Sequence, residues 1–114
     1  MTNKPLTIFT PAYNRAHTLP RTYASLLAQK SRDFVWLIID DGSTDGTEDL
    51  VRGWMNSDNG FEIRYIRKEN GGMHTAHNTA YENIDTELNA CIDSDDALAE
   101  NAVEIILSEW KRVK

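Results

Sequence analysis

Apolar and polar residues alternate along the chain in a pattern that predicts four strands separated by helices. Short runs rich in β-branched and other apolar residues, bounded by Pro, Gly, Asn or Asp, are typical of strands. The segment VWLII within the second run is apolar at every position, as expected for a central strand that helices cover on both faces. The expected strands are Leu6–Thr10, Phe34–Ile39, Glu62–Arg67 and Leu88–Ile92.

Between and after these runs, apolar residues recur every three or four positions, which is the period of a helix with one buried face. Thr18 is expected to cap the first helix, with Pro20 in its first turn. Asp45 and Glu48 have the spacing of a capping box at the start of the second helix. The expected helices run from about Thr18 to Gln29, Gly46 to Asn56, His74 to Asn83 and Asn101 to Arg112. The residues expected to face the core from these helices are Leu19, Tyr23, Leu26, Leu27, Leu50, Val51, Trp54, Met55, Ala76, Ala80, Tyr81, Ala102, Ile105 and Ile106.

This alternation predicts an α/β fold, with a mostly parallel, Rossmann-like sheet of about four strands and helices on both faces. The 114 residues suffice for one hydrophobic core, so residues 1–114 are expected to form a single domain. In open α/β sheets, ligands bind beyond the carboxyl ends of the strands. The residues that follow each expected strand are therefore the candidates for a functional site.

Composition narrows the class of protein. The net charge of −6 disfavours nucleic acid as a partner, because binding the phosphate backbone requires a positive surface. A single cysteine, Cys91, excludes an internal disulfide and is typical of a reducing compartment; its place in an apolar run predicts a small core residue. No transmembrane segment or signal peptide is apparent. We therefore expect a cytoplasmic protein, for which contact with the cytoplasmic face of a membrane stays open.

Acidic residues follow three of the four expected strands. Asp93 and Asp95 lie two residues apart where a strand opens into a loop, so their carboxylates can converge on one Mn²⁺ or Mg²⁺ ion. The alternative is that Asp95 or Asp96 caps the next helix or turn. The second acidic strand end, at Asp41, favours a divalent cation held by Asp95 and Asp93.

The end of the second strand, Asp40-Asp41-Gly42-Ser43, is suited to a tight turn and a helix cap, but neither role explains the paired aspartates. An aspartate here can accept hydrogen bonds from the N–H of a nucleotide base or from a ribose hydroxyl. Tyr13, at the neighbouring strand end, could stack on a base, and Arg15 could face a phosphate; ordinary surface packing is an equal alternative for both. Gly72 follows Gly71 in a segment that is either a simple turn or a place where backbone approaches a ligand closely.

Taken together, these motifs resemble the family 2 glycosyltransferases, which have the GT-A fold. The resemblance covers nearly the whole chain and rests on the order and spacing of five motifs. It implies a metal-dependent, inverting transfer of a sugar from a nucleotide-diphosphate sugar, with UDP-sugars favoured, to a hydroxyl of a glycan or lipid-linked acceptor. The five motifs are TPAYNR (10–15), LLAQ (26–29), IDDGSTDGT (39–47), ENGGMHTAHN (69–78) and CIDSDD (91–96).

The resemblance also implies roles for individual residues. Asp41 would bind the base, commonly uracil, Asp93 would approach the ribose, and Asp95 would coordinate the metal that bridges the diphosphate. The family often has arginine at the position of His77, so a cation on the phosphate side would be weaker in this chain. The full nucleotide-binding set implied is Pro11, Tyr13, Arg15, Asp41, Gly72, Asn78 and Asp93.

The chain departs from the family after Asp96, where one expected helix follows and no catalytic base is evident. Glu100, Glu104 and Glu109 are acidic, but their helical spacing is typical of a solvated face. We therefore expect a donor-binding portion of a glycosyltransferase, with the base beyond Lys114; the alternative is a non-catalytic nucleotide-binding or assembly module. An open sheet edge beside the fourth strand predicts a homo-oligomer.

Overall fold

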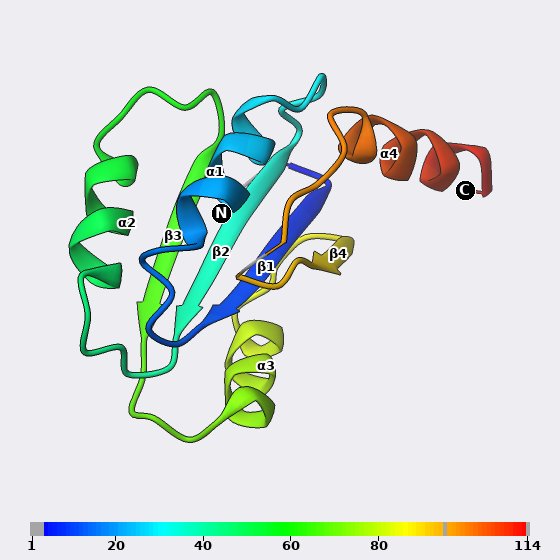
Figure 1. The fold of residues 1–114 in the computed structure, drawn as a ribbon. Coiled ribbons are helices and arrows are strands. Elements are labelled where there is room, and N and C mark those ends of the chain that lie inside the picture. The colour runs from blue at the N-terminus through cyan, green and yellow to red at the C-terminus, as the bar shows by residue number, and fades with distance from the viewer. Residues whose placement is uncertain (1–3, 95, 114) are drawn as a thin grey trace.

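The computed structural model describes residues 4–94 and 96–113 and has the predicted α/β architecture (Figure 1). Strands and helices alternate along the chain, and every predicted element is present. The strands are β1 Leu6–Ala12, β2 Phe34–Asp40, β3 Glu62–Arg67 and β4 Leu88–Cys91. The helices are α1 Leu19–Leu27, α2 Thr47–Met55, α3 Met73–Glu82 and α4 Ala102–Val113.

The four strands form one parallel sheet in the order β3-β2-β1-β4. All residues of β1 and β2 are buried, which confirms the prediction that the second strand is central. In β3 and β4, at the two edges of the described sheet, buried or half-buried residues alternate with more exposed ones in part of each strand. The continuous apolar run therefore corresponds to the position covered on both faces.

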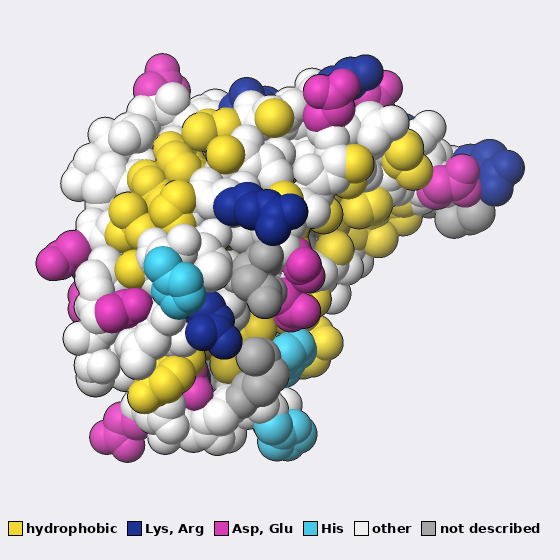
Figure 2. All heavy atoms as spheres, viewed as in Figure 1, with side chains coloured by type: hydrophobic (Ala, Val, Ile, Leu, Met, Phe, Trp, Pro, Cys, Tyr) yellow, Lys and Arg dark blue, Asp and Glu magenta, His cyan; other side chains and the backbone are white. Residues whose placement is uncertain are grey.

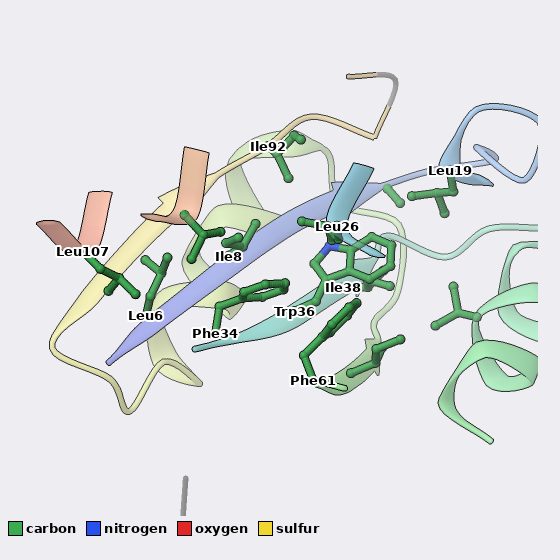
Figure 3. Packing of buried hydrophobic residues seen from close by; sticks show 14 residues of the cluster. Leu6, Ile8, Leu19, Leu26, Phe34, Trp36, Ile38, Phe61, Ile92 and Leu107 are labelled. Atoms are coloured by element: carbon green, nitrogen blue, oxygen red, sulfur yellow. The ribbon is translucent and has the colours of Figure 1, made fainter. Parts of the chain in front are cut away.

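Helices cover both faces of the sheet, as predicted. Leu6, Ile8 and Trp36 point toward α1, α2 and α4, and Figure 3 shows them packed with Leu26 and Leu107 from the helices. The alternate residues of the same strands point to the opposite face, where α3 packs on them, because successive side chains of a strand lie on opposite sides. That second cluster consists of Phe9, Leu37, Ile39, Ala76 and Ala80.

Three predicted core positions are wrong, because Met55 of α2, at 40% exposure, Tyr81 of α3 and Ile105 of α4 lie beside the buried stripes of their helices. In α4 the buried side chains are Val103 and Leu107, at 0% and 7% exposure, whereas Ile105 is 53% exposed. In α3 the edge of the Tyr81 ring contacts Phe9, but Tyr81 remains 56% exposed.

Figure 2 shows hydrophobic side chains beneath α4, where this helix extends from the body of the molecule.

The predicted helix caps are correct only in part. Pro20 lies in the first turn of α1 as expected, but Thr18 makes no side-chain cap and its hydroxyl donates to the carbonyl of Arg15. Asp45 does hold the start of α2, accepting the N–H of Thr47 at 2.9 Å. Glu48 instead pairs with Arg52, so no capping box forms.

Gln29 connects the end of α1 to the start of α4. Its buried side chain donates to the carbonyl of Ala99 at 2.7 Å and accepts the N–H of Val103 at 3.0 Å. The hydroxyl of Thr22 donates to the carbonyl of Asp96. These long-range hydrogen bonds hold the segment that follows β4 against α1.

Cys91 is exposed, which contradicts the prediction that it is a core residue. The reason is the edge position of β4, which has a neighbouring strand on one side only within the described chain. Cys91 lies on the α3 face, where its Sγ is 3.8 Å from Nε2 of His77.

Candidate functional site

The strand register brings three side chains into one row at the carboxyl edge of the sheet. The last paired residues of β1, β2 and β3 are Ala12, Asp40 and Arg67. The N–H of Asp41 donates to the carbonyl of Ala12 at 2.8 Å, and the N–H of Lys68 donates to the carbonyl of Asp40 at 2.9 Å. The residues that follow the pairs, Tyr13, Asp41 and Lys68, therefore stand side by side.

A pocket of about 190 Å³ opens at this edge. It is smaller than the roughly 300–1,000 Å³ that encloses a drug-sized ligand, so it can hold one ring or a similar fragment of a larger ligand. Its walls combine apolar side chains with one buried carboxylate and the backbone of a glycine loop. The lining residues are Pro11, Ala12, Tyr13, Asp41, Asn70, Gly72 and Ala76.

Asp41 supplies the buried carboxylate, with only 5% of the residue exposed. Its Oδ1 accepts hydrogen bonds from Nζ of Lys68 at 2.6 Å and from the N–H of Gly71 at 2.9 Å. Its Oδ2 accepts the N–H of Gly72 at 2.9 Å. Burial alone would raise the pKa of Asp41, but these three hydrogen bonds and the charge of Lys68 outweigh it and lower the pKa below 3.8. Asp41 is therefore an ionised acceptor at neutral pH.

Two glycines let the loops around Asp41 pack closely. Gly42 has φ +80°, and a Cβ there would lie 2.9 Å from the backbone nitrogen of Asn70. A Cβ on Gly71 would lie 2.8 Å from Oγ1 of Thr75. A side chain at Gly42 would push the loop after β3 away from the loop after β2, whereas a side chain at Gly71 would displace Thr75 at the start of α3.

Asn14 joins the loop after β1 to the loop after β2. Its side-chain oxygen accepts the N–H groups of Thr44 at 2.7 Å and Asp45 at 3.2 Å, and its own N–H donates to Oγ of Ser43 at 2.8 Å. Asn14 has φ 52°, a left-handed conformation that asparagine tolerates better than most residues. This junction fixes the backbone that presents the half-exposed ring of Tyr13 at the pocket mouth.

The structure brings four of the seven predicted nucleotide-binding residues together in the pocket: Pro11, Tyr13, Asp41 and Gly72. Arg15 and Asn78 are exposed and lie outside the pocket lining. Arg15 nevertheless contributes backbone contacts, since its N–H donates to Oγ1 of Thr47 and its carbonyl accepts the N–H of Leu19.

Asp93 follows β4 and is exposed, so its carboxylate is accessible to a ligand. Asp95, the other predicted metal ligand, lies outside the described residues. Among residues 4–94 and 96–113, no three His, Cys, Asp or Glu side chains converge at metal-binding distances. The donor chemistry at Asp93 nevertheless suits a hard divalent cation, which commonly takes one or two protein carboxylates and completes its shell with water and phosphate oxygens.

Sequence reasoning did not assign four residues to the site: Ala12, Lys68, Asn70 and Ala76. The available signal for Lys68 was its position directly after the third expected strand, which in a parallel sheet lies beside the residue after the second strand. Asn70 donates from its side chain to the carbonyl of Asp41 at 3.1 Å, a contact with no signature in sequence. Ala76 forms part of the wall because α3 crosses this end of the sheet.

The ring-sized pocket, with its ionised acceptor, lies at the carboxyl edge of a parallel sheet, which is where open α/β domains bind their ligands. The chain belongs to glycosyl transferase family 2, which matches residues 7–113. It is 36% identical over 106 residues to TuaG of Bacillus subtilis (strain 168), a glycosyltransferase provisionally named for teichuronic acid biosynthesis, covering 91% of this chain and 42% of that protein. It is 35% identical to the chondroitin synthase of Pasteurella multocida (strain Pm70), covering 96% of this chain and 11% of that protein.

Solved structures confirm the GT-A fold. TarS of S. aureus, determined with UDP-GlcNAc, superposes with a TM-score of 0.85 at 22% identity, over 94% of this chain and 31% of that one. The mannosyltransferase PcManGT of Pyrobaculum calidifontis, determined with GDP-Man and Mn²⁺, gives a TM-score of 0.83 at 24% identity, over 93% of this chain and 32% of that one.

The chain spans less than half the length of these relatives. Within the described residues, no helix has both the length and the hydrophobicity needed to cross a membrane.

Proposed function

We propose that this chain binds the nucleotide of a nucleotide-diphosphate sugar and that the protein transfers the sugar to an acceptor hydroxyl. The observation that carries the proposal is the ionised carboxylate of Asp41 in the wall of a ring-sized pocket at the carboxyl edge of the sheet. A base enters this pocket, hydrogen-bonds to Asp41 and stacks on Tyr13, with Pro11 and Gly72 as further walls. Two relatives by fold were determined with UDP-GlcNAc and GDP-Man, which supports a nucleotide-linked sugar as donor.

The remainder of the donor lies outside the pocket in this proposal. Asp93 approaches the ribose, while Arg15 and Asn78 face the phosphates from the neighbouring loops and α3. Asp93 and Asp95 would hold Mn²⁺ or Mg²⁺, and PcManGT was determined with Mn²⁺. When bound, such a cation stabilises the negative charge of the departing nucleotide diphosphate.

The transfer is proposed to invert the configuration at the anomeric carbon. The acceptor oxygen attacks that carbon, the bond to the diphosphate breaks, and a carboxylate base takes the acceptor's proton. The acceptor is proposed to be a glycan or lipid-linked, and the names of the relatives, which refer to teichuronic acid and chondroitin, support a glycan. The single cysteine supports a reducing, cytoplasmic location, which includes the cytoplasmic face of the membrane.

The decisive measurement is thermal unfolding with and without UDP and Mn²⁺. We expect the ligands together to raise the melting temperature of the wild type, because a ligand that binds only the folded state stabilises it. Asp95→Ala should remove the metal-dependent part of this rise. Asp58→Ala should retain it, because Asp58 is exposed in the connection from α2 to β3, before the amino end of that strand. The absence of a shift with UDP, GDP or their sugar conjugates would contradict the proposal.

A second candidate is a nucleotide-binding module without catalysis. The observation in its favour is the position of the acidic residues that follow Asp96. Glu104 borders a shallow depression with Ser31 and Asp33, which precede β2, and the carbonyl of Glu100 accepts the N–H of Lys30. Both acids therefore lie near the amino edge of the sheet, opposite the pocket, and cannot act as the base. Release of UDP from UDP-sugars with candidate acceptors separates the two: binding without turnover favours the module.

We further propose that the chain self-associates through β4. This strand is at the edge of the described sheet and pairs only with β1 there, so its outer backbone groups can pair with another chain. Light scattering across a concentration series tests this, and a monomer at every concentration would contradict it.

A further inference from the structure

Lys68 is largely buried beside the pocket, with 18% of its side chain exposed. Its ammonium group contacts three oxygen atoms: Oδ1 of Asp41 at 2.6 Å, the carbonyl of Glu69 at 2.6 Å and Oγ1 of Thr75 at 2.9 Å. An ammonium group has three N–H donors, so all of them are used. The lysine is thus held in one orientation rather than moving freely at the surface.

The donors around Asp41 are distributed unevenly between its two oxygens. A carboxylate has about four acceptor positions, two on each oxygen. Lys68 and the N–H of Gly71 occupy both positions on Oδ1, while Gly72 occupies one on Oδ2. Within the described part of the chain, one acceptor position therefore remains, on Oδ2, for a ligand in the pocket that Asp41 lines.

We propose that Lys68 is a positioning residue that determines which base the pocket accepts. The inference rests on the proposed function. By occupying Oδ1, Lys68 leaves Asp41 able to accept a single N–H, which matches the one ring N–H of uracil. Guanine presents a ring N–H and an amino group side by side, and pairing both with a carboxylate requires both oxygens. Adenine has no ring N–H, and its amino group stands beside a ring nitrogen acceptor, which would face the carboxylate of Asp41.

The surrounding loop is built to keep Lys68 in place. Thr75, on the first turn of α3, accepts from Lys68 and donates to the carbonyl of Gly72 at 2.8 Å. A Cβ on Gly71 would lie 3.2 Å from Nζ of Lys68, so the absence of a side chain there allows the lysine to reach Asp41. The same contacts that fix Lys68 therefore also fix the N–H groups of Gly71 and Gly72 on the carboxylate.

The test is a comparison of nucleotide preference by isothermal titration calorimetry with UDP and GDP. We expect the wild type to bind UDP more tightly than GDP. Lys68→Met frees an acceptor position on Oδ1, so the ratio of the GDP to the UDP dissociation constant should fall by about tenfold or more, whatever happens to either affinity alone. Arg67→Met is the matched control, because it removes the same charge one residue earlier and Arg67 contacts Asp40 and Glu48 instead. Its ratio should equal that of the wild type.

Two further variants keep the outcome decisive. Lys68→Arg retains the charge and donors and should preserve the preference for UDP. If circular dichroism shows that Lys68→Met is unfolded, Thr75→Val decides. This variant leaves the side chain of Asp41 unchanged and removes the acceptor of Lys68 together with the donor to the carbonyl of Gly72, so it should shift the ratio in the same direction. UDP binding with an unchanged ratio in the folded variant overturns the role of Lys68 and leaves the proposed function intact. Failure of the wild type to bind either nucleotide overturns both.

Discussion

The hydroxyl of Tyr65 donates a hydrogen bond to Oδ2 of Asp40, a carboxylate with no solvent exposure. The N–H of Ser43 donates to Oδ1 of Asp40 at 2.8 Å, and Nη1 of Arg67 lies 3.7 Å from Oδ2. Asp40 therefore links β2, β3 and the loop that leads to α2. The two adjacent aspartates have different tasks, because successive residues of a strand point to opposite faces: Asp40 supports the fold on the α2 face, and Asp41 turns toward α3 and the pocket.

Removing the Tyr65 hydroxyl should destabilise the fold. Tyr65→Phe leaves a buried carboxylate with one donor fewer, and we expect a loss of about 1–3 kcal/mol in the free energy of unfolding. Urea unfolding measures it. Tyr81→Phe is the matched control, because that side chain is 56% exposed and should change stability by less than about 0.5 kcal/mol. Equal effects in the two variants would contradict a structural role for the Tyr65–Asp40 contact.

The backbone conformation of Asn14 and its side chain should each contribute separately to the free energy of unfolding. Asn14→Ala imposes the cost of a left-handed conformation on alanine and removes the acceptor for two N–H groups, for a loss of about 2–4 kcal/mol. Asn14→Gly accommodates the conformation and should lose only about 1–2 kcal/mol. Denaturant unfolding of both variants gives the comparison; a glycine variant as unstable as the alanine variant would assign the whole effect to the side chain.

Asp41 should make stability depend on pH in acid. Its pKa in the folded protein lies below the ordinary 3.8, so its contribution to stability is present above 3.8 and is lost as the pH falls through the lower folded value. Asp41→Asn cannot titrate. The stability difference between wild type and Asp41→Asn should therefore be largest near neutral pH and shrink as the pH is lowered past 3.8. Unfolding curves at a series of pH values measure it, and a difference that does not vary with pH would show that the carboxylate is not stabilised in its charged form.

Cys91 should tolerate substitution with little loss of stability, and its thiol should react with reagents in solution. Because it is exposed at the edge strand, Cys91→Ser should cost less than about 0.5 kcal/mol. Ala80→Ser is the contrasting variant, since it places a hydroxyl at a position with no exposure and should cost about 1–3 kcal/mol. Maleimide labelling of the folded wild type should modify Cys91; a thiol protected until unfolding would contradict its exposure.

Much of the fold followed from local pattern. The predicted bounds of the strands and helices lie within a few residues of the observed bounds, because the period of apolar residues indicates which face of each element is buried. The family followed from the order of five motifs along the chain. The errors concern burial at the margins. Ile105 and Tyr81 are apolar or amphipathic residues beside the true buried stripe, and a rotation of the helix by one residue decides which of its side chains reach the core.

The pocket-lining residues that could be predicted are those whose position directly after or at the end of an expected strand placed them at the carboxyl edge of the sheet. Pro11, Tyr13, Asp41 and Gly72 line one pocket, as the strand ends suggested. For Arg15, Asn78 and Asp93 the nucleotide contacts remain predictions, and Asp95 lies outside the described residues. The position of Lys68 directly after the third strand was a signal for the site, but its contacts depend on the register of β2 against β3 and on the loop that returns to α3.

The sequence by itself determined a parallel α/β sheet, its apolar central strand and the acids at its carboxyl edge, since these depend on residue type and spacing along the chain. The tertiary structure alone decided that Asp40 is enclosed by Tyr65 while Asp41 faces the pocket with one oxygen occupied by Lys68. The physical reason is that a hydrogen bond between residues 25 or 27 positions apart depends on how neighbouring strands align, and no local pattern encodes that alignment.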